Sequence, residues 1–374
     1  MPYVPRVAGS TRTQKDRRRL RRSSILAGVG DGVVAAALPL LAVDLTRDPV
    51  TISLVVAAQH VPWVVVRLLW PRLRVDRRTV VGAVDTARAL TLGWLGVLAA
   101  AGHDSMHWIE LTAFIVGLGE VLTDGTESES ADVSGLSARA MVGMAVLGLP
   151  LGGFLFEIFP AIPFLFEVLA FAAAALFALL VGRPVVAPAQ DDAWLEGELP
   201  NPPILLLASA GVTAFAAAMV AGILVLYAHD DLGLGAPAFG FLLAGLAACA
   251  AAGGVVTPLV GERLGVRLTL VLALLGAAGG HAVASQVAST DRPIFGAMAL
   301  GVTAAAAMMA SVLFRAGAGR SVGRLHLVVW SAIPLGAVAG GEIARQRSVH
   351  EVVAWSAAGF ALAAIIRLTP SGGT

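Results

Sequence analysis

The most regular feature of the sequence is a series of long apolar segments between residues 24 and 367, separated by short polar stretches. A helix that crosses the hydrocarbon core of a bilayer needs about 20 mostly apolar residues. Twelve segments approach or reach that length: 24–45, 51–69, 79–101, 108–125, 135–157, 162–182, 204–227, 236–259, 267–287, 293–314, 321–344 and 349–367. The pattern therefore predicts an all-α polytopic membrane protein with twelve transmembrane helices.

One polar segment is longer than the others and differs in composition. Residues 183–203 contain five prolines and four acidic residues, and they divide the chain nearly in half. Clusters of proline and polar residues are typical of linkers. The sequence thus predicts a basic tail, an N-terminal six-helix bundle, a cytoplasmic linker, a C-terminal six-helix bundle and a short tail, at 1–23, 24–182, 183–203, 204–368 and 369–374.

The two halves repeat each other at a spacing of about 185 residues. Arg139 followed by the motif at 150–153 corresponds to Arg324 followed by the similar motif at 334–341. Six spans in the same orientation in each half predict two bundles related by a pseudo-two-fold axis along the membrane normal, an arrangement found in transporters.

Composition excludes several classes of protein. Hydrophobic residues make up 57% of the chain and charged residues 14%, whereas a soluble domain has about 45–50% and about 25%. A soluble enzyme, a nucleic-acid binder and a disordered scaffold are therefore excluded. The single cysteine, Cys249, excludes an internal disulfide framework and thiolate metal clusters. The sequence also lacks the common hydrolase, metalloprotease and phosphate-binding motifs, so we expect no enzyme activity, no cofactor and no metal.

Charge is distributed unevenly, although the net charge is only +1. Residues 6–22 hold eight basic side chains against one acid, Asp16. Such a block can be a nucleic-acid arm, but it directly precedes an apolar span, which favours a cytoplasmic tail. The loops after the second, eighth and tenth spans are also basic. The positive-inside rule then places both termini in the cytoplasm, with Arg345 and Arg347 as the one conflict.

Several motifs resemble those of bacterial major facilitator superfamily transporters, in the branch that includes multidrug, macrolide and siderophore exporters. They are Gly30-Asp31-Gly32, the segments 37–42 and 45–49, Asp76-Arg77-Arg78, Gly119-Glu120 and the motif at 150–153. The resemblance implies a location in the bacterial cytoplasmic (inner) membrane. It also implies a secondary active transporter that exports a hydrophobic or amphipathic small molecule by alternating access.

The loop after the second span departs from this family pattern. The gating loop usually contains a glycine and an aspartate, but Leu69 and Leu73 occupy the corresponding positions. The charged residues that remain in the loop are Arg74, Asp76, Arg77 and Arg78. The acidic partner of the usual latch is therefore missing.

Charged residues within the spans are candidates for proton coupling, because each costs about 2.5–3.5 kcal/mol at the centre of a bilayer. Five lie at similar depth in the N-terminal half: Asp31, Asp85, Arg88, Glu120 and Asp124. Asp85 and Arg88 are spaced to pair on one helix face. With one arginine among four acids, at least one acid is expected to hold a proton near neutral pH. Asp31 has no basic neighbour at helical spacing and is the predicted proton carrier; the alternative is a polar cluster that only fixes packing.

The candidate substrate cavity combines two sets of residues. Gln59, His60 and Trp63 lie in the middle of the second span. The family resemblance implies that the first, fourth, seventh and tenth spans line the cavity, which adds Phe215, Met219, Met308 and Met309. Methionine and aromatic surfaces suit hydrophobic substrates of varied shape. Packing in the core or against lipid is the alternative for each of them, and Glu167 in the sixth span has no assigned role.

The functional prediction is a proton-coupled exporter whose partners are a small-molecule substrate, protons and the lipid bilayer. We expect a monomer that binds no nucleic acid. The missing latch acid motivates a different hypothesis, a transport-inactive relative that acts as a membrane scaffold or assembly partner. A polytopic membrane enzyme is a third class, but the sequence contains no nucleophile or metal constellation for it.

Overall fold

The computed structural model describes residues 14–69, 77–124, 141–179, 204–287, 293–319 and 322–369. The N-terminal half contains α1 (Gln14–Leu45), α2 (Pro49–Leu69), α3 (Arg77–Ala101), α4 (Met106–Asp124), the π-helix η2 (Met144–Gly148), α6 (Leu149–Ile158) and α7 (Ile162–Leu179). The C-terminal half contains α8 (Ile204–Leu226), the π-helix η3 (Tyr227–Asp231), α9 (Ala236–Leu264), α10 (Val266–Ala284), α11 (Pro293–Ala318), α12 (Val322–Gln346) and α13 (Val349–Leu368).

These helices confirm the predicted fold class. Each predicted span coincides with a helix in the described part of the chain, and nine helices there are long and apolar enough to cross a membrane by length and composition alone. Several boundaries differ from prediction by a few residues, and the two largest differences are in α1 and α9. α1 begins at Gln14, inside the predicted tail, because lysine and arginine favour helix. α9 continues to Leu264 and ends where Gly265 adopts a φ of 80°.

Local sequence explains how the chain reverses between spans. Asp48 precedes α2, and its carboxylate accepts a hydrogen bond from the Thr51 N–H at 2.9 Å, with Pro49 at the first helical position. This is the usual chemistry of a helix N-terminus. Hydrogen bonds from the Thr51 hydroxyl and N–H hold the pKa of Asp48 below its ordinary value. The start of α2 is thereby fixed after a turn of three residues that follows the end of α1.

Glycines set the closest helix contacts, and they do so equivalently in both halves. Gly148 and Gly152 lie against the backbone of α1, where a Cβ would collide with the carbonyl oxygens of Val29 and Val33. In the C-terminal half, Gly336 and Gly340 lie against the backbone of α8 in the same way, at Phe215 and Met219. Small residues permit this approach between helices. The predicted repeat of the two halves is visible in these paired contacts.

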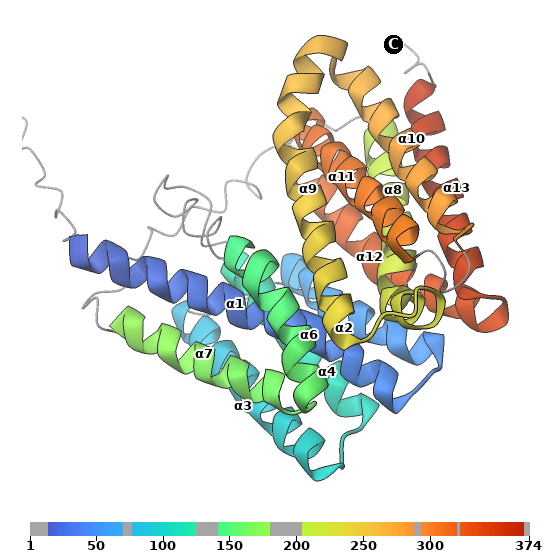
Figure 1. Cartoon of the computed structure of the whole chain (residues 1–374). Coiled ribbons are helices and arrows are strands. Elements are labelled where there is room, and N and C mark those ends of the chain that lie inside the picture. Colours follow the sequence, from blue (N-terminus) through green and yellow to red (C-terminus); the bar gives the residue numbers. More distant parts are fainter. Residues whose placement is uncertain are drawn as a thin grey trace, which may run out of the picture.

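The two bundles meet near one end of the molecule and diverge toward the other (Figure 1). The meeting end, here called the closed end, carries the turns at 46–48, 102–105, 159–161, 232–235 and 347–348. The opposite end, called the open end, is where α1 begins and α13 finishes. Two helix pairs, α6 with α9 and α2 with α12, make the main contacts between bundles. Gly153 and Gly240 allow the first pair to touch through backbone atoms.

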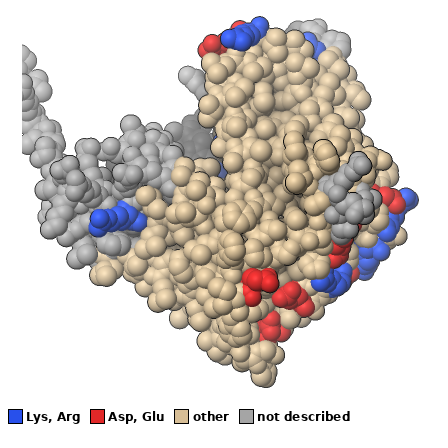
Figure 2. All heavy atoms as spheres, in the orientation of Figure 1, with Lys and Arg blue, Asp and Glu red and all other residues tan. Residues whose placement is uncertain are grey.

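The outer surface is suited to lipid. Large apolar side chains are exposed on many helices, such as Leu90 on α3, Val255 on α9 and Ile365 on α13. In Figure 2 the described Lys, Arg, Asp and Glu residues gather toward the ends of the molecule, and the surface between is uncharged. A soluble protein does not expose apolar side chains to water over an area as large as this. The chain is therefore a multi-pass membrane protein.

Candidate functional site

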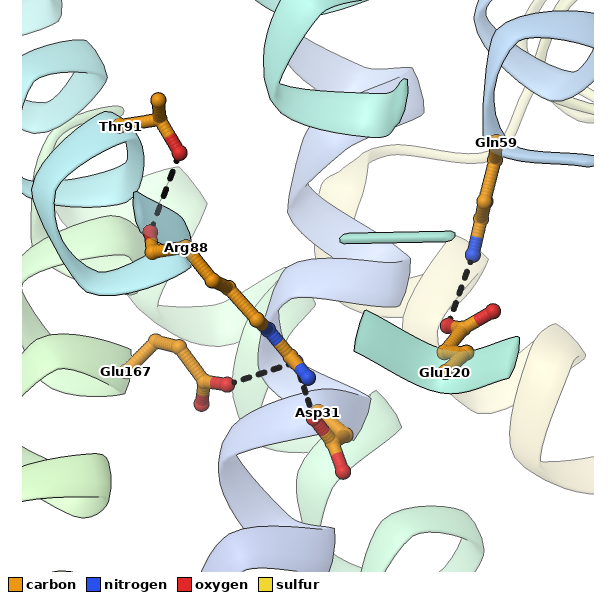
Figure 3. A network of polar contacts seen from close by, with 6 residues as sticks. All are labelled: Asp31, Gln59, Arg88, Thr91, Glu120 and Glu167. Carbon is orange, nitrogen blue, oxygen red and sulfur yellow. Dashed lines mark hydrogen bonds and ion pairs between the residues drawn. The ribbon is translucent and has the colours of Figure 1, made fainter. Parts of the chain in front are cut away.

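The interior of the N-terminal bundle contains an ionic cluster in which Arg88 of α3 binds two carboxylates. Its Nη2 atom donates to Asp31 Oδ1 of α1 and, at 3.1 Å, to Glu167 Oε1 of α7. Figure 3 shows the three side chains converging from three helices. Arg88 and Glu167 are buried, whereas 39% of the Asp31 side chain is exposed. These three residues are called the Arg88 triad below.

Neighbouring residues explain why this part of the sequence can hold the triad. A Cβ at Gly30 would overlap the Glu167 carboxylate, so glycine there lets the carboxylate lie beside α1. A Cβ at Gly32 would lie 2.6 Å from the Met144 carbonyl oxygen. The Arg88 guanidinium also lies over the Phe171 ring, 4.4 Å from its centroid, a favourable cation–π contact. The glycines on either side of Asp31 thus admit α7 and η2.

A second polar group lies between α2 and α4. Glu120 Oε1 accepts a hydrogen bond from Gln59 Nε2 at 3.0 Å. Gly117, one turn earlier on α4, contacts the backbone of Gln59, where a larger residue would collide. Figure 3 shows this pair in the same region as the Arg88 triad. Glu120 therefore adds a carboxylate to the region that holds the Arg88 triad.

Aromatic contacts join this region to the other bundle across the α2–α12 seam. The Trp63 ring stacks on Trp330 of α12, with centroids 4.0 Å apart and planes 15° apart, and the His60 ring lies 5.8 Å from Trp330. Further toward the open end, Arg67 Nη1 lies 3.2 Å from His326 Nδ1, and its guanidinium lies over Trp63. The contacts between α2 and α12 therefore extend along much of α2.

The closed end has a polar contact between bundles. Arg47, in the turn after α1, donates to Asp230 Oδ1 at 3.0 Å, and its Nη1 lies 3.2 Å from His229 Nδ1. The two partners belong to η3, the π-helix that ends the α8 span. The next residue, Asp231, faces His350 instead, with Oδ1 3.2 Å from Nε2. Arg47, His229 and Asp230 are called the closed-end latch.

The structure revises two expectations about proton-coupling residues. Arg88 binds Asp31 and Glu167, so the predicted pair with Asp85 is wrong; Asp85 is partly buried on the same helix, three residues before Arg88. Asp31 is accordingly not isolated from basic groups. Helical spacing within one span could not reveal Arg88, which comes from a different helix. Glu120 is hydrogen-bonded to Gln59, and the side chain of Asp124 is outside the described residues.

The predicted cavity residues are divided between two places. Gln59, His60 and Trp63 lie at the α2–α12 seam. In the C-terminal bundle, Met219 is buried, and the other three, Phe215, Met308 and Met309, are partly buried. Met308 lies beside Gly254 of α9. Of the predicted gating loop, Arg74 and Asp76 are outside the described residues, as are the side chains of Arg77 and Arg78.

Sequence reasoning missed two residues. The sequence assigns no role to Glu167, although an acid five residues into an apolar span is itself a signal, since such charges are costly. Trp330 is not among the predicted cavity residues. Nothing in its own span marks it, because its importance arises from the stack with Trp63 of the other bundle.

Comparisons with known proteins agree with the fold. No family model matches the sequence, and no curated protein sequence matches it. A bacterial homologue of the iron transporter ferroportin, solved in an inward-facing state, has a TM-score of 0.75 at 16% identity over 95% of this chain and 98% of its own. The nucleoside transporter NupG has a TM-score of 0.74 at 13% identity over 94% and 98%.

A bacterial homologue of the human lysosomal transporter Spinster is also similar, with a TM-score of 0.68 at 14% identity over 94% of this chain and 95% of its own. At these identities the likeness shows the fold alone. The described chain therefore has the fold of major facilitator transporters, as the sequence resemblance implied.

Proposed function

We propose that this protein is a secondary active transporter that exports a hydrophobic or amphipathic small molecule in exchange for protons. The observation that carries the proposal is the Arg88 triad, a buried ion cluster on three helices with one partly exposed member. A cluster of this kind is costly in a membrane interior. Apolar side chains could pack these helices without the cost of burying charge. The presence of the ion cluster therefore favours a function in proton transport.

The triad supports proton binding through its charge balance. Two carboxylates oppose one guanidinium, and Glu120 adds a third negative charge nearby. Glu167 Oε2 is buried and has no hydrogen-bond partner among the described residues. A proton on the cluster removes part of this unbalanced charge from a low-dielectric interior. Asp31 is the proposed entry point, because its exposed side chain is accessible to water.

Alternating access is the proposed way in which proton binding moves the substrate. In the proposed orientation the open end faces the cytoplasm, as the positive-inside rule predicts, and the closed end faces outside. A proton that enters from outside neutralises Asp31 and lowers the cost of occluding the site. Release to the cytoplasm restores the ion pair with Arg88 and resets the bundles. Binding of a proton or a substrate can shift the equilibrium between the inward-open and the outward-open state only if the two states differ in their affinity for it.

One observation favours a second candidate. The loop after α2 has Leu73 where family members carry an acidic latch residue. A chain that has lost this latch is a candidate for a transport-inactive membrane scaffold or assembly partner. This candidate predicts that no solute movement responds to a proton gradient.

Uptake into inverted membrane vesicles tests the proposal. The probes are tetraphenylphosphonium, ethidium and erythromycin, measured with and without a proton gradient in vesicles with and without the protein. The proposal predicts uptake of at least one probe that needs both the protein and the gradient. Uptake that persists after the gradient is collapsed contradicts proton coupling. Uptake equal to that of vesicles without the protein, for every probe, favours the scaffold.

The closed-end latch gives a smaller prediction. Arg47→Glu is expected to shift the equilibrium between the closed and the open arrangement of the closed end toward opening by about 1.4- to fivefold, because an exposed ion pair contributes about 0.2–1 kcal/mol. Asp230→Arg is expected to act likewise, and the double variant to restore the original balance. The measurement is the labelling rate of a cysteine introduced at Ser53 by a membrane-impermeant maleimide, in a Cys249→Ala background. Equal rates in all four proteins would contradict a latch.

A further inference from the structure

Two atoms of the Arg88 triad have no hydrogen-bond partner, although both are buried. The bonds that exist all use one nitrogen: Arg88 Nη2 donates to Asp31 Oδ1 and, at 3.1 Å, to Glu167 Oε1. Arg88 Nε and Glu167 Oε2 are the two atoms without a partner within the described helices. Buried polar groups are nearly always paired, so two exceptions within one ion pair need an explanation.

These two atoms are the ones that a complete arginine–carboxylate pair uses. A guanidinium presents Nε–H and an N–H of Nη2 along one edge, and this edge can donate two parallel hydrogen bonds to the two oxygens of a carboxylate. Nη2 already bonds Glu167, so half of such a two-bond fork exists. Nη2 is instead shared with Asp31, and each carboxylate receives one bond.

The surroundings of the guanidinium favour Glu167 over Asp31 as its lasting partner. Phe171, on α7 like Glu167, holds its ring centroid 4.4 Å from Arg88 Cζ. On α4, a Cβ at Gly119 would lie 3.7 Å from Arg88 Cδ, so this helix also passes close to the side chain. Glu167 is 1% exposed, whereas the Asp31 side chain is 39% exposed and accessible to water. A protonated carboxyl accepts hydrogen bonds more weakly than a carboxylate. A proton on Asp31 therefore leaves Glu167 as the stronger acceptor.

We propose that Glu167 is a positioning residue that takes Arg88 into a two-bond fork when Asp31 binds a proton. The proposal rests on the proposed function and names how proton binding changes the contacts between helices. The Asp31 carboxylate gains the proton and loses its bond from Nη2, and the Nε–H of Arg88 forms a new bond to the Glu167 carboxylate. The triad then changes from one positive and two negative charges to one of each, and both remaining charges are paired.

The exchange of bonds acts on α1. With Asp31 released, Arg88 no longer joins α1 to α3, whereas the fork keeps α3 and α7 together. α1 also contacts α8 and α9 of the other bundle, and the turn that follows it carries Arg47 of the closed-end latch. Proton binding thus frees the helix that connects the triad with the closed end.

Other titratable groups lie on the helices packed around the guanidinium, and the test must separate them from Glu167. Glu120 on α4 is the direct competitor, because its carboxylate lies in the same region in Figure 3. The others are Asp85 on α3, His60 on α2 and, near the closed end of α6, Glu157.

Dipolar recoupling by solid-state NMR measures the new contact without a known substrate. The full-length protein in lipid bilayers is isotope-labelled at arginine Nε and at the glutamate carboxyl carbon, and the coupling between them is recorded at about pH 5 and about pH 8. The variants are Asp31→Asn, Glu167→Gln and Glu120→Gln. Asp104→Asn, in the turn between α3 and α4, is the matched control for Asp31→Asn. Subtracting the Glu167→Gln signal removes the exposed pairs of Glu342 and Glu351.

The proposal predicts a coupling from Arg88 Nε to the Glu167 carboxyl that is weak at the higher pH and strong at the lower pH. Asp31→Asn should show the strong coupling at both pH values, Glu120→Gln should retain the pH-dependent change, and Asp104→Asn should behave as the parent. Equal coupling at both pH values in the parent, weak coupling in Asp31→Asn, or a change lost in Glu120→Gln would each overturn the proposal.

Arg88→Lys separates a fork from simple charge balance, because lysine keeps the charge but cannot present two parallel donors. The readout is the infrared band of the protonated Asp31 carboxyl, assigned by its absence in Asp31→Asn. Its pH midpoint is expected to fall by about 1–2 pH units, the equivalent of one charge-assisted hydrogen bond lost from the protonated state. Arg263→Lys, an exposed site on α9, should titrate as the parent. An unchanged midpoint in Arg88→Lys would contradict the fork.

These outcomes are distinct from failure of the transport proposal. If vesicles show proton-driven uptake but the coupling to Glu167 does not change with pH, only the role of Glu167 fails. If no probe moves but the coupling appears on acidification, the fork stands and transport fails.

Discussion

Arg88→Gln is expected to lower the free energy of unfolding by about 3–5 kcal/mol, the usual cost of removing one partner from a buried ion pair. The reason is that Glu167, which is 1% exposed, loses the guanidinium that balances its charge. The measurement is unfolding in mixed detergent micelles. Arg263→Gln is the control, because that arginine is exposed near the end of α9 and its replacement should have little effect.

A second substitution shows whether charge imbalance causes this loss. Adding Glu167→Gln to Arg88→Gln removes the unbalanced carboxylate, so the double variant is expected to regain much of the lost stability. If the two substitutions destabilise additively, the triad does not act as one ionic unit. The account of the site would then have to be abandoned, whatever the transport assays show.

Asp31→Asn is expected to reduce proton-driven uptake to the level of vesicles without the protein. Asparagine matches the shape of aspartate but cannot take up and release a proton, so the cluster stays neutralised at one position. Exchange of labelled for unlabelled probe across the membrane requires no net proton movement and should continue. Uptake and exchange are measured in vesicles matched for expression, with Asp104→Asn in the turn between α3 and α4 as the control.

Two results would remove Asp31 from the mechanism. One is proton-driven uptake by Asp31→Asn at the rate of the parent protein. The other is equal loss of driven uptake and exchange, because that pattern indicates a folding or binding defect rather than a loss of coupling.

The spans could be predicted from sequence because lipid imposes a simple physical requirement: each crossing needs about 20 apolar residues with their backbone bonds satisfied internally. The close contacts made by Gly148 and Gly152 could also be predicted, since small residues at that spacing form one helix face. The π-helices could not. η2 and η3 lie within apolar segments whose periodicity does not distinguish a π-helix from an α-helix.

The candidate site was predictable in its residue types but not in its pairings. Sequence spacing within one helix suggested Asp85 for Arg88, yet its partners Asp31 and Glu167 are 57 and 79 residues away in the chain. Those pairings depend on how α1, α3 and α7 pack. The role of Trp330 was harder to predict. Its stack with Trp63 depends both on the position of α12 and on how the two bundles meet.

The central claim, that this protein exchanges protons for a solute, is tested most directly by reciprocity in proteoliposomes of the purified protein with an internal pH dye. An imposed proton gradient should drive accumulation of the probe identified in vesicles. An imposed gradient of that probe should, in turn, drive protons in the opposite direction, and Asp31→Asn should show neither movement. Probe that runs down its own gradient without any change in internal pH would contradict the claim.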